Sequence, residues 1–290
     1  MYNIDIHADD YALTMHSSKD IIALLIDGCL DSISIMTNMS CFKEAMKLYE
    51  DNESKFAKKP LINVHLNFME GHCVSPKEQV PLLVDNYGYF KLSWGNLFFS
   101  HSRELKEQLK IEIISQIDAL CATPLMLKTN VRLDSHQHTH MTKIVFSAIE
   151  EAILEKSYNV TFIRNAQESP MLFLNKISVY PTLKIVNLIK EWLLYFRSLE
   201  MKKRLKKYNK ENQGFCGLLF SGSMDNRVIK ILPNIIKKAN KKRMEVLFHP
   251  GSVLKEEIGT EFVKPGFVEF HLSEGRIIEN QTVRALKLLI

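Results

Sequence analysis

The segment from Asp134 to His140 has the composition of a metal site, because it places three histidines two residues apart. It reads DSHQHTH, and His136, His138 and His140 would lie on one face if the segment were extended. Histidine is the commonest nitrogen ligand of metals in proteins, and such clusters are uncommon outside metal sites. We expect one of the three to bind a metal directly and the others to contact substrate or support the ligands. Asp134 either orients a histidine or accepts backbone hydrogen bonds.

Other residues of the same chemistry are dispersed along the chain. Asp9 and Asp10 are adjacent, so on an extended backbone one carboxylate can bind a metal while the other faces a substrate. Such pairs also commonly cap a helix or close a turn. A lone histidine such as His65 is more often structural than catalytic. His249 precedes a Pro-Gly turn, which either holds the imidazole at the rim of a site or is stabilised by it. The remaining histidines show no partner pattern and are interpreted as structural or surface residues: His7, His16, His72, His101 and His271.

Short β-like runs alternate with amphipathic helical stretches along the whole chain. Alternation of strand and helix indicates parallel strands joined by crossover helices, and about seven such units favour an α/β barrel, complete or incomplete. The predicted strands are Ile4–Ala8, Ser32–Thr37, Ile62–Leu66, Val131–Asp134, Val160–Arg164, Phe215–Phe220 and Glu245–Phe248.

The candidate side chains share one position relative to these strands. Each lies at or just after the C-terminal end of a strand, which is where α/β barrels and open α/β sheets build their sites. Asp9 and Asp10 follow the first strand, Asn38 the second, His65 lies near the end of the third, the histidine cluster follows the fourth, Arg164 ends the fifth and His249 the seventh. We therefore expect one site at this edge, in which Arg164 pairs either with Asp9 or with a polar group of the substrate.

The chain shows no linker or change of composition that would divide it, so we expect one domain over residues 1–290. Two long segments interrupt the strand and helix pattern and are interpreted as insertions, one over Glu70–Phe99 (near 70–99) and one over Pro170–Gly214 (near 170–214). Long irregular loops in compact domains are usually functional or mobile.

Composition and charge exclude several classes of protein. Apolar residues make up 46% and charged residues 24% of 290 residues, a globular profile that argues against disorder and coiled coils. The formal net charge of +5 owes much to residues 201–210, MKKRLKKYNK. This run is interpreted as a solvated helix face or, alternatively, a patch for an acidic partner. It lacks the interleaved aromatic residues of a nucleic-acid platform, so we expect no nucleic-acid partner.

Cysteine usage and hydropathy indicate a cytoplasmic protein. The five cysteines are odd in number and form no CxxC motif, which suits reduced thiols. The N-terminus lacks a basic segment followed by an apolar one, and no window approaches 18 apolar residues, so we expect neither a secretory signal nor a membrane partner. Because GxGxxG, GxxxxGK[ST] and GxSxG motifs are absent from the sequence, dinucleotide, P-loop and serine-hydrolase sites have no support.

Four motifs together resemble those of the YdjC-like carbohydrate deacetylases, a family that includes the chitooligosaccharide deacetylases. They are ADDYALT, VHLNFMEG, LDSHQHTHM and FHPG, and they extend from Ala8 to Gly251 in the order of the family. The resemblance implies a distorted (β/α) barrel, one divalent metal ion (Mg²⁺ or Zn²⁺) and hydrolysis of acetamido groups on sugars. His7 and Ala12 stand where the family usually has Asn and Gly, and Gln137 stands where a middle histidine is common.

The resemblance also implies a role for each matching residue. Asp10, His65 and His136 would bind the metal, Asp9 would be the catalytic base and His249 the acid. We further assign Asn38, His138 and Arg164 to substrate binding, and Asp134 and His140 to the support of the ligands. The expected partners are a small-molecule or oligosaccharide substrate and a second copy of the chain in a homodimer. Two alternatives are a metal-dependent phosphoesterase, which would usually need two metals, and a catalytically silent sugar-binding protein.

Overall fold

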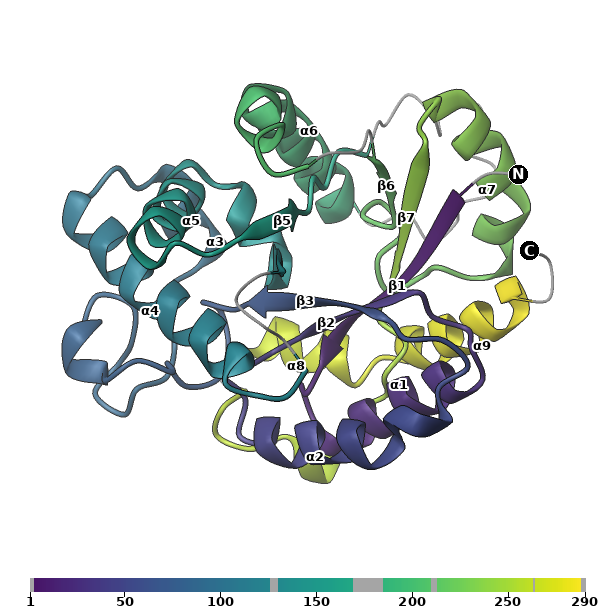
Figure 1. Ribbon diagram of the computed structural model, residues 1–290, viewed down its shortest axis with the longest axis horizontal. Coiled ribbons are helices and arrows are strands. Elements are labelled where there is room, and N and C mark those ends of the chain that lie inside the picture. The colour runs from purple at the N-terminus through teal and green to yellow at the C-terminus, as the bar shows by residue number, and fades with distance from the viewer. Residues whose placement is uncertain (1–2, 126–129, 169–184, 210–212, 263, 288–290) are drawn as a thin grey trace.

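The computed structural model describes residues 3–125, 130–168, 185–209, 213–262 and 264–287 (Figure 1). Seven parallel strands form one sheet in the order β5-β4-β3-β2-β1-β7-β6. The predicted α/β class with about seven parallel strands is confirmed. The strands are β1 (Asn3–Tyr11), β2 (Ser32–Ile35), β3 (Leu61–Leu66), β4 (Val131–Ser135), β5 (Val160–Ile163), β6 (Gln213–Cys216) and β7 (Arg243–Phe248).

Helices follow the strands and cover the outside of the sheet (Figure 1). They are α1 (Met15–Ile26), α2 (Phe42–Asn52), α3 (Trp94–Phe99), α4 (Arg103–Cys121), α5 (Lys143–Lys156), α6 (Ile185–Leu205), α7 (Asn226–Ala239), α8 (Pro265–His271) and α9 (Gly275–Lys287). The helix α1 begins where Thr14 and Ser17 form a capping box, which satisfies free N–H groups of its first turn. No helix within the described ranges is long and apolar enough to span a bilayer.

The two faces of the sheet differ in chemistry because side chains alternate along each strand. In β1, Ile6 and Ala8 belong to the apolar core that packs beneath the helices. The intervening residues Asp5, His7 and Asp9 are buried on the opposite face. There His7 contacts Ser32 and Ser34 of β2 at 2.6 and 2.7 Å, and Ser34 donates to Asp134. The inner face of the sheet is therefore a hydrogen-bonded polar layer.

Contacts of Arg164 show that the sheet curls into an incomplete barrel. Arg164 lies directly after β5, yet its guanidinium donates to Asp9 on β1 and to Glu245 on β7. Strands β4, β3 and β2 lie between β5 and β1 in the sheet, so these contacts require the sheet to close on itself. Strands β5 and β6 are the two edges of the barrel (Figure 1).

Every strand differs from its predicted range at one end at least, and two of the differences matter for the site. Asp9 and Asp10 do not follow β1 but lie in its irregular end, where the pairing with β2 shifts between Ala8 and Tyr11 and Asp10 has a φ of 67°. A bulge of this kind turns a side chain away from its regular direction. Strand β6 ends at Cys216 and does not extend to Phe220, because Gly217, at a φ of 130°, begins a turn. The N–H groups of residues 217–219 then donate to the Glu168 carboxylate and not to a strand.

The two segments interpreted as insertions are partly described. Residues 70–99 contain α3, a short 3-10 helix (Lys77–Gln79) and two antiparallel bridges. Within 170–214 the structure describes α6, the residues after it to 209, and 213–214 in β6; residues 169–184 and 210–212 lie outside the described residues. The insertions and the single-domain organisation stay predictions.

Candidate active site

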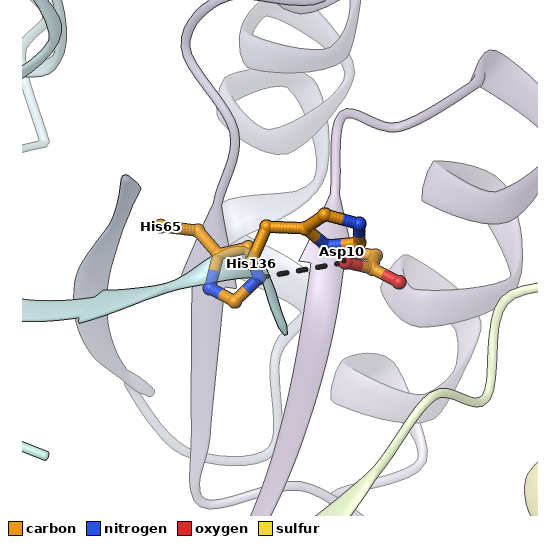
Figure 2. Close-up of side chains that lie close together, drawn as sticks. All are labelled: Asp10, His65 and His136. Atoms are coloured by element: carbon orange, nitrogen blue, oxygen red, sulfur yellow. Dashed lines mark hydrogen bonds and ion pairs between the residues drawn. The ribbon is translucent and has the colours of Figure 1, made fainter. Parts of the chain in front are cut away.

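Asp10, His65 and His136 come from the ends of β1, β3 and β4 and converge on one point (Figure 2). One ligand atom from each lies within 4.8 Å of the other two. The Asp10 Oδ1 atom is 3.1 Å from His136 Nδ1 and 3.5 Å from His65 Nε2. All three side chains are buried. The parallel sheet accounts for this convergence, since the ends of β1, β3 and β4 open onto the same edge.

The histidine cluster after β4 does not present its three imidazoles on one face. Gln137 and His138 adopt left-handed backbone angles, with φ of 57° and 55°, inside a 3-10 turn over His136–Met141. His136 therefore points to Asp10, whereas His140 contacts the Ser135 hydroxyl at 2.6 Å and donates to the Arg164 carbonyl at 2.9 Å. The expected shared face is wrong because the chain turns sharply at this point.

Asp134 orients His65, which is one of the two roles expected for it. Its Oδ1 atom lies 2.7 Å from His65 Nδ1. Asn63 and Arg164 donate to the same carboxylate and hold it in place. In its contact with His65, the Asp134 carboxylate is therefore the acceptor. The His65 Nδ1–H then donates to Asp134, and the lone pair of Nε2 faces Asp10. A carboxylate behind a histidine is the usual arrangement for a metal ligand.

His136 and Asp10 have supporting partners that the sequence did not reveal. His136 Nε2 lies 2.9 Å from Glu70 Oε1, and Asp10 Oδ2 accepts a hydrogen bond of 2.9 Å from Arg276. Glu70 is also contacted by His271 at 3.0 Å. Burial alone would raise the pKa of Glu70, but His271 and His136 lower it to about 2. Each of the three converging residues is thus held from behind by a charged group.

The three atoms that face one another could together bind a divalent cation. Asp10 Oδ1, His65 Nε2 and His136 Nδ1 are all acceptors when the histidines are neutral, and acceptors facing one another require a cation or a proton between them. Burial disfavours the charged imidazole, but the surrounding carboxylates raise the pKa of His65 to about 10 and also raise that of His136. Burial would raise the pKa of Asp10, but His136, His65 and Arg276 hold it well below its usual value. Two nitrogens and one carboxylate oxygen are ligands typical of zinc.

Asp9 lies beside this cluster as an ionised carboxylate. Burial would raise the pKa of Asp9, but the charges of Arg164, His65 and His7 lower it well below the usual value. Arg164 is fully buried and donates to both oxygens of Asp9. The alternative in which Arg164 pairs with Asp9 is therefore the one observed.

A cavity of about 440 Å³ opens over Asp9, His65 and His136, and Asp10 is not among the described residues of its wall. His138 lines it, and the Nδ1 atom of His138 has no hydrogen-bond partner within the described part of the chain. Neither Asn38 nor Arg164 is among the described residues of the wall. The Asn38 amide donates to the backbone carbonyls of Glu70 and His72, and the Arg164 guanidinium donates to Asp9. Its wall is formed by Asp9, His65, His136, Gln137, His138, Lys190, Leu218, Ser221, His249, Gly266, Phe267, Glu269, Phe270 and Ser273.

His249 reaches the same cavity from the end of β7. Its backbone N–H donates to the buried Glu279 carboxylate, and its imidazole packs edge-on against Phe270 with ring centroids 5.5 Å apart. The Nδ1 atom is 3.6 Å from Glu279 Oε2, beyond hydrogen-bond distance. The contacts with Glu279 and Phe270 thus hold His249 at the wall of the cavity, whereas residues 249–254 form neither the expected turn nor a bend.

A second cavity of about 600 Å³ lies between the edge strands β5 and β6. Lys202 and Lys206 of the basic segment line it together with Lys241. None of the converging residues Asp10, His65 and His136 belongs to its described wall. The chemistry expected from the sequence is therefore in the smaller cavity.

Carbohydrate deacetylases are among the known proteins that this chain resembles. A carbohydrate deacetylase of Thermoanaerobacter pseudethanolicus is 31% identical over 150 residues, which are 51% of this chain and 55% of that protein. Another of Clostridium beijerinckii is 27% identical over 154 residues, 53% of this chain and 56% of that protein. This chain therefore spans about half the length of the curated relatives it matches.

The fold is similar to that of a solved structure. A crystal structure from Enterococcus faecalis V583, of a protein named for the cleavage of cellobiose phosphate, has a TM-score of 0.57 at 18% identity. The similarity covers 98% of this chain and 95% of that one and concerns the fold alone. The model of the YdjC-like protein family matches residues 3–285, almost the whole of the chain. On the strength of that match, and of the curled sheet with its Asp and His residues at one edge, the chain belongs to the YdjC-like protein family.

Proposed function

We propose that this chain is a metal-dependent hydrolase that removes acetyl groups from N-acetylated sugars, of the chitooligosaccharide type or a related one. The observation that carries the proposal is the convergence of Asp10 Oδ1, His65 Nε2 and His136 Nδ1 beside the ionised Asp9 at one cavity. The names of the curated relatives, carbohydrate deacetylases, support the substrate class and the amide bond as the bond that is cleaved.

Asp10, His65 and His136 would hold one divalent ion, Zn²⁺ or Mg²⁺. When bound, such an ion polarises the acetyl carbonyl and acidifies water, which lowers the barrier by several kcal/mol. Asp9 removes the proton from the attacking water, and Arg164 keeps it ionised and fixed for that step. His249 donates a proton to the leaving nitrogen of the sugar. A general base or acid contributes about a hundred- to ten-thousandfold each.

The walls of the cavity suit a sugar ring. Phe267 and Phe270 provide apolar surface, while Lys190 and Ser273 provide polar groups for hydroxyls. Burial lowers the pKa of Lys190 to about 8, and its ammonium donates to Gln137 at 2.7 Å. Binding sites that combine aromatic walls with a few polar groups are typical of small-molecule sites.

A release assay tests the proposal. The purified protein is incubated with N-acetylated chitooligosaccharides of increasing length, and acetate is measured with and without a chelator. We expect acetate release that the chelator abolishes and that added Zn²⁺ or Mg²⁺ restores. Binding of the sugars without release would favour a silent sugar-binding protein. Release of phosphate from phosphate esters, together with two metal ions per chain, would favour a phosphoesterase.

A further inference from the structure

Five buried side chains form a closed ring of contacts around one side of the converging residues. Starting from Asp10, the ring passes through His136, Glu70, His271 and Arg276 and returns to Asp10. The five contacts measure 3.1 Å (Asp10 to His136), 2.9 Å (His136 to Glu70), 3.0 Å (Glu70 to His271), 3.0 Å (His271 to Arg276) and 2.9 Å (Arg276 to Asp10). Because each member has a relative exposure of 3% or less, water does not compete for these contacts.

The ring fixes the position of the protons on both histidines. An arginine side chain only donates hydrogen bonds, so His271 Nδ1 must accept from Arg276. His271 Nε2 then carries the proton and donates to Glu70. Glu70 has only acceptor atoms when ionised, so His136 Nε2 must also donate to it. The nitrogen of His136 that remains free to bind a cation is Nδ1, which faces Asp10.

The backbone around Glu70 is held as firmly as its carboxylate. Its carbonyl accepts hydrogen bonds of 2.8 Å from both Asn38 and Asn67. Gly71 follows at a φ of 75°, and a Cβ atom at that position would lie 2.7 Å from Asn38 Nδ2. The turn therefore presents the Glu70 side chain in one position, and Asn38 contributes to the site through this turn.

We propose that Glu70 is the positioning residue of the metal site: it fixes His136 with Nδ1 toward the ion, and through His271 and Arg276 it couples this imidazole to Asp10. The inference rests on the proposed function. It adds that His136 binds the ion through Nδ1 and that Glu70 selects this nitrogen. Partners of this kind orient metal ligands, and their loss typically weakens metal binding about 10- to 100-fold.

The ring also argues against an ion on the other side of His136. Glu70, His136 and His271 offer a second group of ligand atoms within 4.8 Å of one another. In the ring, however, the Nε2 atoms of His136 and His271 both carry the protons that they donate to Glu70, so neither offers a lone pair to a cation there. On the Asp10 side, Arg276 contacts Oδ2 and leaves Oδ1 for the ion.

Zn²⁺ titration of the metal-stripped, full-length protein tests the proposal without reference to turnover. Affinity is measured by competition with a chromophoric chelator for the wild type, Glu70→Ala and Glu70→Gln. We expect Glu70→Ala to bind Zn²⁺ about 10- to 100-fold more weakly. Glu70→Gln should fall between it and the wild type, because the amide oxygen still accepts from His136 but carries no charge. The absorption spectrum of bound Co²⁺ should change in Glu70→Ala, since it reports the arrangement of the ligands.

The matched control is Glu112→Gln. Glu112 is an equally buried carboxylate that accepts from the Val74 and Ser75 backbone and lies outside the ring. Its variant should bind Zn²⁺ as the wild type does. Equal affinity of wild type and folded Glu70→Ala overturns the proposal and leaves the proposed function standing. If Glu70→Ala does not fold, the isosteric Glu70→Gln decides, and wild-type affinity in that variant overturns the proposal. A wild type that binds neither Zn²⁺ nor Mg²⁺ in this titration refutes both.

Discussion

Arg164 donates to both carboxylate oxygens of Asp9, with Nη1 2.9 Å from Oδ2 and Nη2 2.8 Å from Oδ1. The same guanidinium also contacts Asp134 and Glu245, so one buried arginine balances three carboxylates from β1, β4 and β7. This relationship ties the closure of the barrel to the position of the proposed base.

Replacing Asp9 separates catalysis from metal binding. Asp9→Asn keeps an acceptor for Arg164 but cannot take a proton, so we expect kcat for acetate release to fall about a hundred- to ten-thousandfold. Metal content, measured on the same sample, should be unchanged because Asp9 is not one of the proposed ligands. The control is Asp225→Asn, at a helix N-cap where asparagine serves as well as aspartate. Retained activity in Asp9→Asn would reassign the base.

Replacing Arg164 should destabilise the fold. Arg164→Met leaves Asp9, Asp134 and Glu245 buried without their cation, which costs about 3–5 kcal/mol of the free energy of unfolding. Urea unfolding followed by circular dichroism measures this loss. Arg227→Met removes an exposed arginine whose ion pair with Asp225 is worth about 0–1 kcal/mol. Equal losses in the two variants would mean that Arg164 does not hold the barrel closed.

His140 should make stability depend on pH. Burial, the largest influence, holds the pKa of His140 near 4, below the ordinary value of 6.5. The folded state favours the neutral imidazole. The contribution of His140 to the free energy of unfolding is therefore fully present above pH 6.5 and is lost as the pH falls toward 4. The loss amounts to roughly 3 kcal/mol, at 1.4 kcal/mol per pKa unit.

His140→Gln removes this titration. We expect the variant to be less stable than the wild type at pH 8, and the difference to narrow between pH 6.5 and 4 in urea unfolding. A difference that stays constant over this range would contradict the account, because it would show that the folded state protonates His140 as readily as the unfolded state does.

The sequence predicted the part of the site that local patterns encode. Parallel strands follow from the alternation of strand and helix, and their C-terminal ends share an edge, so Asp10, His65 and His136 could be assigned to one place. Their convergence within 4.8 Å agrees with that assignment, although their role as ligands stays a proposal. For Asp134 the sequence left two roles open and did not name His65 as the histidine that it contacts.

The rest of the site depends on contacts between distant segments. Glu70 and His271 are 201 residues apart and meet because the fold places the last residue of α8 beside the segment that follows β3. A lone histidine carries no local signal of such a partner, and His271 was therefore interpreted as structural or surface. Arg276 was missed for the same reason. His7 was interpreted in the same way as His271, and it is buried with Asp5 and Asp9 on the inner face of the curled sheet.

Local backbone geometry was equally hard to foresee. The positive φ angles of Asp10, Gln137 and His138 turn the candidate residues toward one another, and none of the three is glycine. Such conformations are uncommon for residues other than glycine, and they persist where surrounding contacts enforce them. Here the ion pair of Asp10 with Arg276 and the bond of Lys190 to Gln137 are among those contacts.

The central claim is tested most directly by anomalous diffraction from a crystal of this protein soaked in Zn²⁺, with data collected on both sides of the zinc edge. We predict one anomalous peak, at bonding distance from Asp10 Oδ1, His65 Nε2 and His136 Nδ1. A peak between Glu70 and His271 on the Nε2 side of His136, or no peak at this edge of the sheet, would contradict the account.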